Sequence, residues 1–215
     1  MLFRSLVMAS GNEEAREARL LLYESQDLLH WTYRGILYRW ENARFAECPS
    51  LMPAGDGYLL AASVVTSAGH WFTLMYGTLE DGVFSPVLSS EVDRGPDQYA
   101  GQAFHAGDGR NLLITWIPGW PYAGYAERSV GCMSVPRELT VSDGKLLGAP
   151  AREIRHLLTG EDPALRRTPR GFTVERTGRE PLVWEGDLRR LELLRNGYIL
   201  EIFVNGGEEV YSVLL

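Results

Sequence analysis

One acidic residue stands in a context that suits proton transfer. Glu47 is followed by Cys48-Pro49, and this triplet opens the apolar segment Ser50-Leu51-Met52-Pro53. A carboxyl group at the mouth of a strand is partly withdrawn from water, which favours its protonated form and fits it to donate a proton near neutral pH. The plainer alternative is a solvated glutamate at a strand entrance. Glu47 is therefore the candidate general acid/base.

Three other groups downstream could serve a binding site. Asp93 and Asp97 flank Gly95-Pro96, Tyr99 follows them, and Trp116 lies in the apolar run 111–117. The aspartates could bind a polar ligand or could hydrogen-bond their own backbone in a turn. The tryptophan could stack on a sugar and the tyrosine could contact it, although both aromatic residues could equally pack in a core.

The elements that must position these residues are short strands. Apolar runs such as 57–65, 71–76, 111–117 and 198–204 alternate with tight turns, an arrangement that indicates an all-β chain. The predicted turns are Ala54-Gly55-Asp56-Gly57, Glu80-Asp81-Gly82, Gly107-Asp108-Gly109, Ser142-Asp143-Gly144 and Asn205-Gly206-Gly207. A loose echo between Tyr23-Glu24-Ser25 and Tyr76-Gly77-Thr78, roughly 50 residues apart, favours propeller blades over a sandwich.

The character of the chain changes after Leu147. The segment 151–158 is followed by a polar stretch, Thr159 to Gly171, that contains two prolines and is expected to be a surface loop. A few more strands then end at Leu215. We predict blades over residues 1–147 and a short C-terminal β segment over residues 148–215.

Composition limits the possible partners and cofactors. The 215 residues carry a formal net charge of -7, which disfavours nucleic acid and anionic membranes as partners. No run of about twenty apolar residues appears, and the first residues form no convincing signal peptide. Two cysteines suggest free thiols in a reducing cytoplasm. The four histidines have no zinc-site spacing, and no glycine-rich phosphate loop is present, so no metal or organic cofactor is expected.

The motifs, in this order, resemble the second half of a β-fructosidase of glycoside hydrolase family 32. Glu47-Cys48-Pro49 matches the family's Glu-Cys-Pro, and residues 93–102 are similar to its Asp-x-Gly-x-Asp-Phe-Tyr-Ala-x-Gln, with Gln98 where phenylalanine is usual. Pro136-Arg137-Glu138-Leu139 matches the segment that closes the family's propeller, and its Arg137 and Glu138 are expected to form a structural ion pair or blade-closing hydrogen bonds and not to be catalysts. Glu201 to Asn205 resembles a late strand of the family's C-terminal sandwich.

The resemblance implies a fold and roles for individual residues. It implies about three blades of a five-bladed propeller, followed by a shortened β-sandwich. Glu47 would be the general acid/base, and Asp93, Tyr99 and Trp116 would contact a fructose-containing sugar. The family's nucleophile lies in an Asn-Asp-Pro-Asn stretch and a third carboxylate in Arg-Asp-Pro, and this chain contains neither.

These observations predict a β-fructosidase-like protein of the sucrose- and fructan-hydrolysing type with an incomplete catalytic set. Retaining glycosidases need two carboxyl groups about 5 Å apart, so weak or absent hydrolysis is expected from this chain alone. The alternatives are a non-catalytic carbohydrate-binding module and a structural remnant that associates with itself. Because three blades leave sheet faces uncovered, we expect a homo-oligomer.

Overall fold

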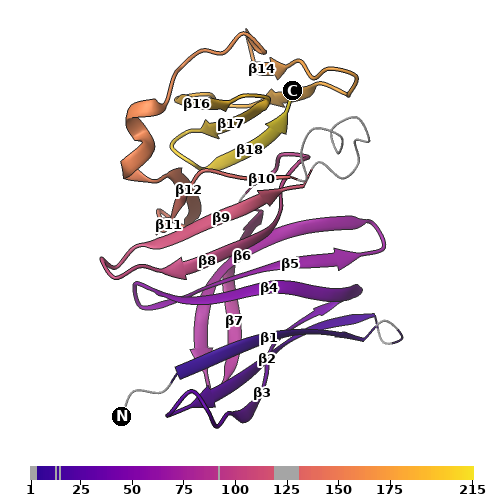
Figure 1. The fold of residues 1–215 in the computed structure, drawn as a ribbon, viewed down its shortest axis with the longest axis vertical. Helices are drawn as coiled ribbons and strands as arrows, with labels where there is room; N and C mark the ends of the chain where they lie inside the picture. Colours follow the sequence, from indigo (N-terminus) through magenta and orange to yellow (C-terminus); the bar gives the residue numbers. More distant parts are fainter. Residues whose placement is uncertain (1–3, 13, 15, 92, 119–130) are drawn as a thin grey trace.

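The computed structural model describes residues 4–12, 14, 16–91, 93–118 and 131–215, and this part of the chain is almost entirely β (Figure 1). Its first three sheets are antiparallel and follow one another along the chain. The first sheet has the order β1-β2-β3 and the second β4-β5-β6-β7. In the third, the order is β10-β9-β11-β12, with β8 also paired to β9. The strands are β1 (Arg4–Asn12), β2 (Glu17–Ser25), β3 (Thr32–Glu41), β4 (Ala43–Ala54), β5 (Gly57–Thr66), β6 (Gly69–Glu80), β7 (Val83–Glu91), β8 (Tyr99–His105), β9 (Asn111–Ile117), β10 (Cys132–Met133), β11 (Arg137–Ser142) and β12 (Lys145–Pro150).

These three sheets pack face to face as successive propeller blades. The first and second sheets enclose one core, to which Leu20, Leu37 and Val64 belong. The second and third sheets enclose another, which includes Leu59 and Phe72. Because the second sheet is covered on both faces, β5 is buried almost without interruption, and its sequence is a continuous apolar run instead of an alternating one.

The first strand of each sheet lies next to the first strand of the following sheet. β4 contacts β1 on one side and β8 on the other, and Figure 1 shows the three strands one above another. This is the arrangement of inner strands around a propeller axis. The expectation of an all-β chain with about three blades is confirmed, and residues placed on β4 and β8 face each other across neighbouring blades.

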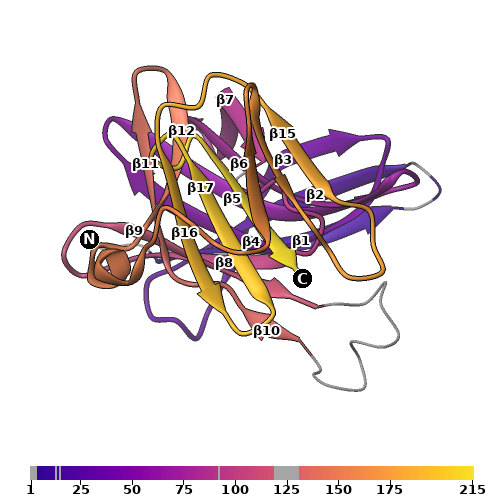
Figure 2. The same cartoon turned by 90° about the horizontal axis from the view of Figure 1, so that it is seen from above.

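The C-terminal part forms two small sheets stacked at one end of the blades (Figures 1 and 2). Their orders are β13-β14-β15 and β16-β17-β18, and their shared core includes Phe172, Trp184 and Ile202. The rings of Phe172 and Trp184 stack with centroids 5.4 Å apart. The elements are the 3-10 helix η1 (Arg152–Leu157) and the strands β13 (Leu165–Thr168), β14 (Gly171–Val174), β15 (Leu182–Glu185), β16 (Leu191–Asn196), β17 (Ile199–Val204) and β18 (Glu209–Leu214). The result is a short sandwich.

Two details of the chain differ from the sequence expectations. The stretch Thr159 to Gly171 is not entirely a loop, because it contains β13, which pairs with β14. As an edge strand with half-buried and exposed side chains, β13 carries no apolar pattern that would reveal it. The strand β12 also runs to Pro150, three residues beyond the predicted boundary at Leu147, and pairs with β11 throughout. All five predicted tight turns are present.

Candidate active site

Glu47 lies on the inner strand β4 beside a β-bulge. The pairing with β5 is regular from Phe45 to Glu47, which is opposite Ser63, then shifts before it resumes at Ser50 and Ala61. Within the bulge, Cys48 has a φ of 48°, a left-handed conformation that costs roughly 1–2 kcal/mol for a residue with a side chain. Bulges re-aim side chains next to active sites. The Glu-Cys-Pro sequence therefore sets the direction in which the half-buried Glu47 carboxyl points.

Tyr99 is the hydrogen-bond partner of this carboxyl group. The Tyr99 hydroxyl donates to Oε2 of Glu47 over 2.6 Å, from the first residue of β8 on the neighbouring blade. The ring is buried, with 5% of its surface exposed. Burial, and then the hydrogen bond to Glu47 and its charge, raise the pKa of Tyr99 far above the ordinary value of a phenol. The tyrosine therefore remains a hydrogen-bond donor throughout the neutral range.

Trp116 completes a row of three predicted site residues. It pairs directly with Tyr99 across β8 and β9, and directly opposed residues of an antiparallel pair share a face of the sheet. The indole is half-buried. Gly131 lies next to the indole nitrogen with a φ of 111°, and a side chain there would bring Cβ within 2.3 Å of the Trp116 Nε1. Glu47, Tyr99 and Trp116 thus follow one another over β4, β8 and β9.

His70 also belongs to this neighbourhood, and it carries no sequence signal. Its imidazole meets the Tyr99 ring edge-on, with centroids 5.4 Å apart and an interplanar angle of 68°. The imidazole is exposed and comes from β6, beyond β5 in the same blade as Glu47. Only the register of β5 and β6 could have revealed it, since the sequence separates it from every motif.

Asp93 lies apart from this row, in a buried ionic cluster. Its side chain has no accessible surface and forms an ion pair with Arg137, at 2.8 Å between Oδ2 and Nη1. Oδ1 accepts the backbone N–H of Gly95, which is the turn bond expected as the alternative to a sugar contact. Glu201 binds the other terminal nitrogen of Arg137, at 2.8 Å. Asp93 therefore joins the third blade to the C-terminal sheet and does not line an open surface in this structure.

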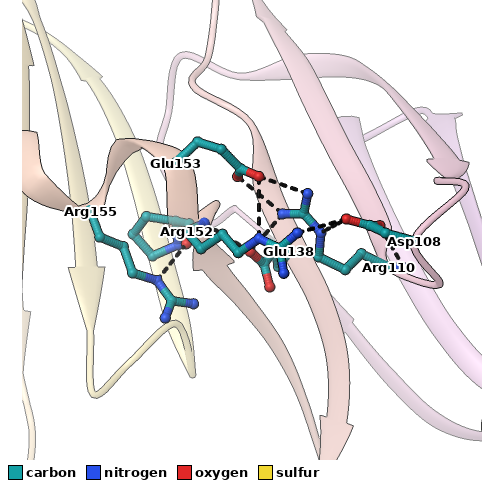
Figure 3. Close-up of polar contacts among 7 residues, drawn as sticks. Asp108, Arg110, Glu138, Arg152, Glu153 and Arg155 are labelled. Carbon is teal, nitrogen blue, oxygen red and sulfur yellow. Dashed lines mark hydrogen bonds and ion pairs between the residues drawn. The ribbon is translucent and has the colours of Figure 1, made fainter.

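Arg137 and Glu138 do not form an ion pair with each other, which was one of the two expectations; each is bound to other residues. Arg137 is fully buried between Asp93 and Glu201. Glu138 belongs to a surface cluster, shown in Figure 3, in which its Oε1 accepts from Arg110 and from the backbone N–H of Arg152. Arg110 also binds Asp108 and Glu153 there, each at 2.8 Å.

This surface cluster joins three elements and is not a second active site. Its side chains come from the turn between β8 and β9, from β11 and from η1, and each of its carboxylates is bound to an arginine. Hydrogen bonds from Arg110 lower the pKa of Glu153 to about 2. Among the described residues, no group of three or more histidine, cysteine or acidic side chains could hold a metal ion.

Stacked antiparallel sheets whose first strands lie side by side form a partial propeller, and a carboxyl–tyrosine pair lies on its inner strands. The family model described as "Glycosyl hydrolases family 32 N-terminal domain" matches residues 4–150. The chain belongs to glycoside hydrolase family 32.

Curated relatives and solved structures agree with this assignment. A sucrose-6-phosphate hydrolase of Escherichia coli is 30% identical over 171 residues, which cover 70% of this chain and 35% of the relative. One of Staphylococcus xylosus is 27% identical, covering 95% of this chain and 42% of the relative. A family 32 β-fructofuranosidase of Bombyx mori superposes with a TM-score of 0.80 at 20% identity, over 99% of this chain and 58% of that one. A mutant of the Bombyx mori enzyme is solved in complex with sucrose. The chain thus spans less than two thirds of the length of each.

Proposed function

We propose that this chain carries the acid/base half of a β-fructofuranosidase site. Glu47 is the proton donor and acceptor, the Tyr99 hydroxyl orients its carboxyl group, and Trp116 offers its indole face to a fructose-containing sugar. The 2.6 Å hydrogen bond between Tyr99 and Glu47 is the observation that carries this proposal, because it holds a half-buried carboxyl group in one direction on an inner strand. General acid/base catalysis depends on such positioning.

The chemistry requires a second carboxyl group. A retaining mechanism places its nucleophile 5–5.5 Å from the acid/base, and the motif that would supply the nucleophile is absent from this sequence. We therefore expect the purified chain to hydrolyse β-fructofuranosides weakly or not at all. Sucrose, sucrose 6-phosphate and short fructans are the substrates to test, given the names of the relatives.

The experiment is fructose release from these sugars by wild-type protein, with Glu47→Gln as the matched variant. Little or no fructose from either protein is the expected result. Vigorous release that disappears in Glu47→Gln would show that another carboxyl group of this chain acts as the nucleophile. Release that persists in Glu47→Gln would remove Glu47 from the mechanism.

The alternative is a non-catalytic carbohydrate-binding role, and Trp116 is the residue that favours it. Its half-buried indole shares a face with Tyr99, and aromatic faces can stack on sugar rings. Calorimetric titration with fructose and short fructans tests this role independently of hydrolysis. Binding that is lost in Trp116→Ala and retained in Glu47→Gln would assign the chain to this class.

We further propose that the chain forms a homo-oligomer through the outer face of its first sheet. Met8, Leu21 and Ile36 are cross-strand neighbours on that face, and Tyr23 and Tyr33 pair beside them, with ring centroids 5.3 Å apart. Met8 and Tyr33 are 44% and 51% exposed. Arg19 and Arg39, both bound to Glu17, lie on the same face. An apolar centre with a mixed-charge border suits a second copy of the same surface.

Light scattering coupled to size-exclusion chromatography tests this association. The double substitution of Met8 and Tyr33 to glutamate is expected to yield a monomer, because it places charges in the apolar centre. Val87→Glu is the control, since Val87 is 67% exposed on the second sheet. A monomeric wild-type protein at micromolar concentration would refute the proposal.

A cytoplasmic location remains a proposal that rests on the cysteines. Neither cysteine forms a disulfide bond, and burial, together with the Glu47 charge, raises the pKa of Cys48. A protonated thiol is the less reactive form and persists in a reducing compartment. No helix in the described part of the chain is long and apolar enough to cross a membrane. Cell fractionation of the natural host would test the location.

A further inference from the structure

The segment that leads into Tyr99 runs along an edge of the C-terminal sandwich. β18 pairs with β17 on one side, and on its other side the backbone N–H of Arg94 donates to the Val210 carbonyl at 2.8 Å. Two backbone N–H groups further along β18 donate to side chains of the same segment. That of Ser212 reaches Oδ1 of Asp93 at 2.9 Å, and that of Leu214 reaches Oδ2 of Asp97 at 2.8 Å. The segment 93–97 therefore replaces the next strand at this edge.

Buried ion pairs of Asp93 and Asp97 reinforce the contact between segment 93–97 and β18. Asp93 is bound by the Ser212 hydroxyl at 2.7 Å and by Arg137. Asp97 is bound by Arg176 at 2.6 Å, and their side chains are 0% and 5% exposed. Hydrogen bonds to a charged group are shorter and stronger than neutral ones, and an uncompensated charge in a buried place is costly. The position of the segment on β18 is therefore tightly defined.

The backbones of segment 93–97 and β18 are so close that only glycine fits at position 95. A side chain there would place its Cβ within 2.3 Å of the Ser212 carbonyl oxygen and 2.4 Å of its nitrogen. Both are backbone atoms, which cannot rotate away. The segment is thus seated directly against β18.

The segment that contacts β18 ends immediately before Tyr99. Only Gln98 separates Asp97 from Tyr99, and its side chain is tied back to the Asp93 carbonyl at 3.1 Å. Consecutive Cα atoms are about 3.8 Å apart, so the tyrosine backbone lies within roughly 8 Å of the clamped aspartate. The Tyr99 hydroxyl then reaches Glu47 in the adjacent blade.

From this chain of contacts we propose that β18 positions Tyr99, and through it the carboxyl group of Glu47, by means of Asp93 and Asp97. These two aspartates are positioning residues, not sugar ligands. The inference rests on the proposed role of Glu47 in catalysis, but the positioning itself is measurable in the free protein. The C-terminal sandwich, although far from Glu47 in the sequence, would thus help to position the candidate active site.

The test follows Tyr99 and β18 by NMR in the same sample. Tyrosine labelled with ¹³C at Cζ reports the ionisation of each phenol, and Tyr99→Phe identifies the Tyr99 signal. Amide exchange at Ser212 and Leu214 reports the edge contact. In Asp97→Asn we expect the Leu214 amide to exchange ~10-fold faster or more, since it loses a charged acceptor, while the Ser212 amide keeps its acceptor Asp93. The Tyr99 phenol should then ionise closer to the ordinary pKa of 10.

Two further variants keep this test decisive. Ser212→Ala removes a hydroxyl that donates to Asp93 and accepts from Arg137, and it serves if Asp97→Asn does not fold; faster exchange on β18 and a shifted Tyr99 signal are again expected. Arg94→Ala is the control, because its exposed side chain binds Glu209 at the start of β18 and its loss leaves the bonds of Asp93 and Asp97 in place, so Tyr99 should be unchanged.

Two results would overturn the proposal. One is faster exchange on β18 with an unchanged Tyr99 signal, and the other is no change at either position. Neither readout involves sugar hydrolysis. Fructose release that persists in Glu47→Gln would therefore count against the proposed function alone, whereas the coupling between β18 and Tyr99 is judged only by the NMR readouts.

Discussion

Removal of the Tyr99 hydroxyl is the most direct perturbation of the candidate site. Tyr99→Phe deletes the donor that lies 2.6 Å from Glu47 and leaves the buried ring in place. A hydrogen bond to a charged group contributes about 1.5–3 kcal/mol to stability. Because Glu47 is half-buried and can regain water, the lower part of this range applies. We expect the free energy of unfolding to fall by about 1–2 kcal/mol at pH 7.

Urea unfolding and calorimetry measure this loss. For a domain of this size, 1 kcal/mol lowers the midpoint temperature by about 2–4 °C, so the variant should melt roughly 2–8 °C below wild type. Tyr33→Phe is the matched control, since Tyr33 is 51% exposed and its loss should change stability by less than about 0.5 kcal/mol. If Tyr99→Phe were as stable as the control, the hydrogen bond would not hold Glu47, and its assignment as the site's positioning contact would fail.

Three further changes probe the rest of the structure. Arg137→Met leaves two buried carboxylates without their counter-charge and should cost about 3–5 kcal/mol in urea unfolding at neutral pH; a cost below 1 kcal/mol would contradict the buried network. Glu153→Gln should lower the melting temperature at pH 7, and the two proteins should have similar melting temperatures near pH 2. Folding lowers the pKa of Glu153 from 4.5 to about 2, so its carboxylate stabilises the folded state above pH 4.5 and loses this effect as the pH falls through 2. Gly95→Ala should melt well below Gly107→Ala, since its Cβ meets the Ser212 backbone while nothing lies within 4 Å of the other; equal melting temperatures would count against the seating on β18.

The strand pattern could be predicted because local residues decide it. The five hairpin turns contain glycine or Asp-Gly where the backbone turns, and the left-handed φ values of Asp81, Asp143 and Asn205 show that requirement. Apolar runs between the turns gave the strands of the blades. β13 was not predicted, because an edge strand with little burial needs no apolar face. Local sequence therefore predicts a strand best where both faces are covered.

The candidate site was only partly accessible from the sequence. Motif order brought Glu47, Tyr99 and Trp116 to attention, and the structure places them on three adjacent strands. The hydrogen bond from Tyr99 to Glu47 crosses between two sheets, and no local pattern encodes which strands of different blades touch. For the same reason His70 was visible only after the register of β5 and β6 was known.

The two aspartates show where residue type alone is ambiguous. An aspartate beside glycine and proline can serve a turn, a ligand or an ion pair, and its partners decide among these. For Asp93 the partner on β18 lies 119 residues further along the chain, far beyond any local pattern. Its burial beside Arg137 is a tertiary fact that depends on how the sandwich docks.

The two flanks of Glu47 are held by different kinds of interaction. On the β8 side, Tyr99 belongs to a segment fixed by buried charges against β18. On the other side, β4 contacts β1, whose sheet exposes Met8 and Tyr33 on its outer face. Buried charged contacts give a defined geometry, whereas a sheet covered on one face opens locally at lower free energy. If the chain associates through that outer face as proposed, the contact would rigidify β1 and the side of Glu47 that Tyr99 does not control, and association would be coupled to the order of Glu47.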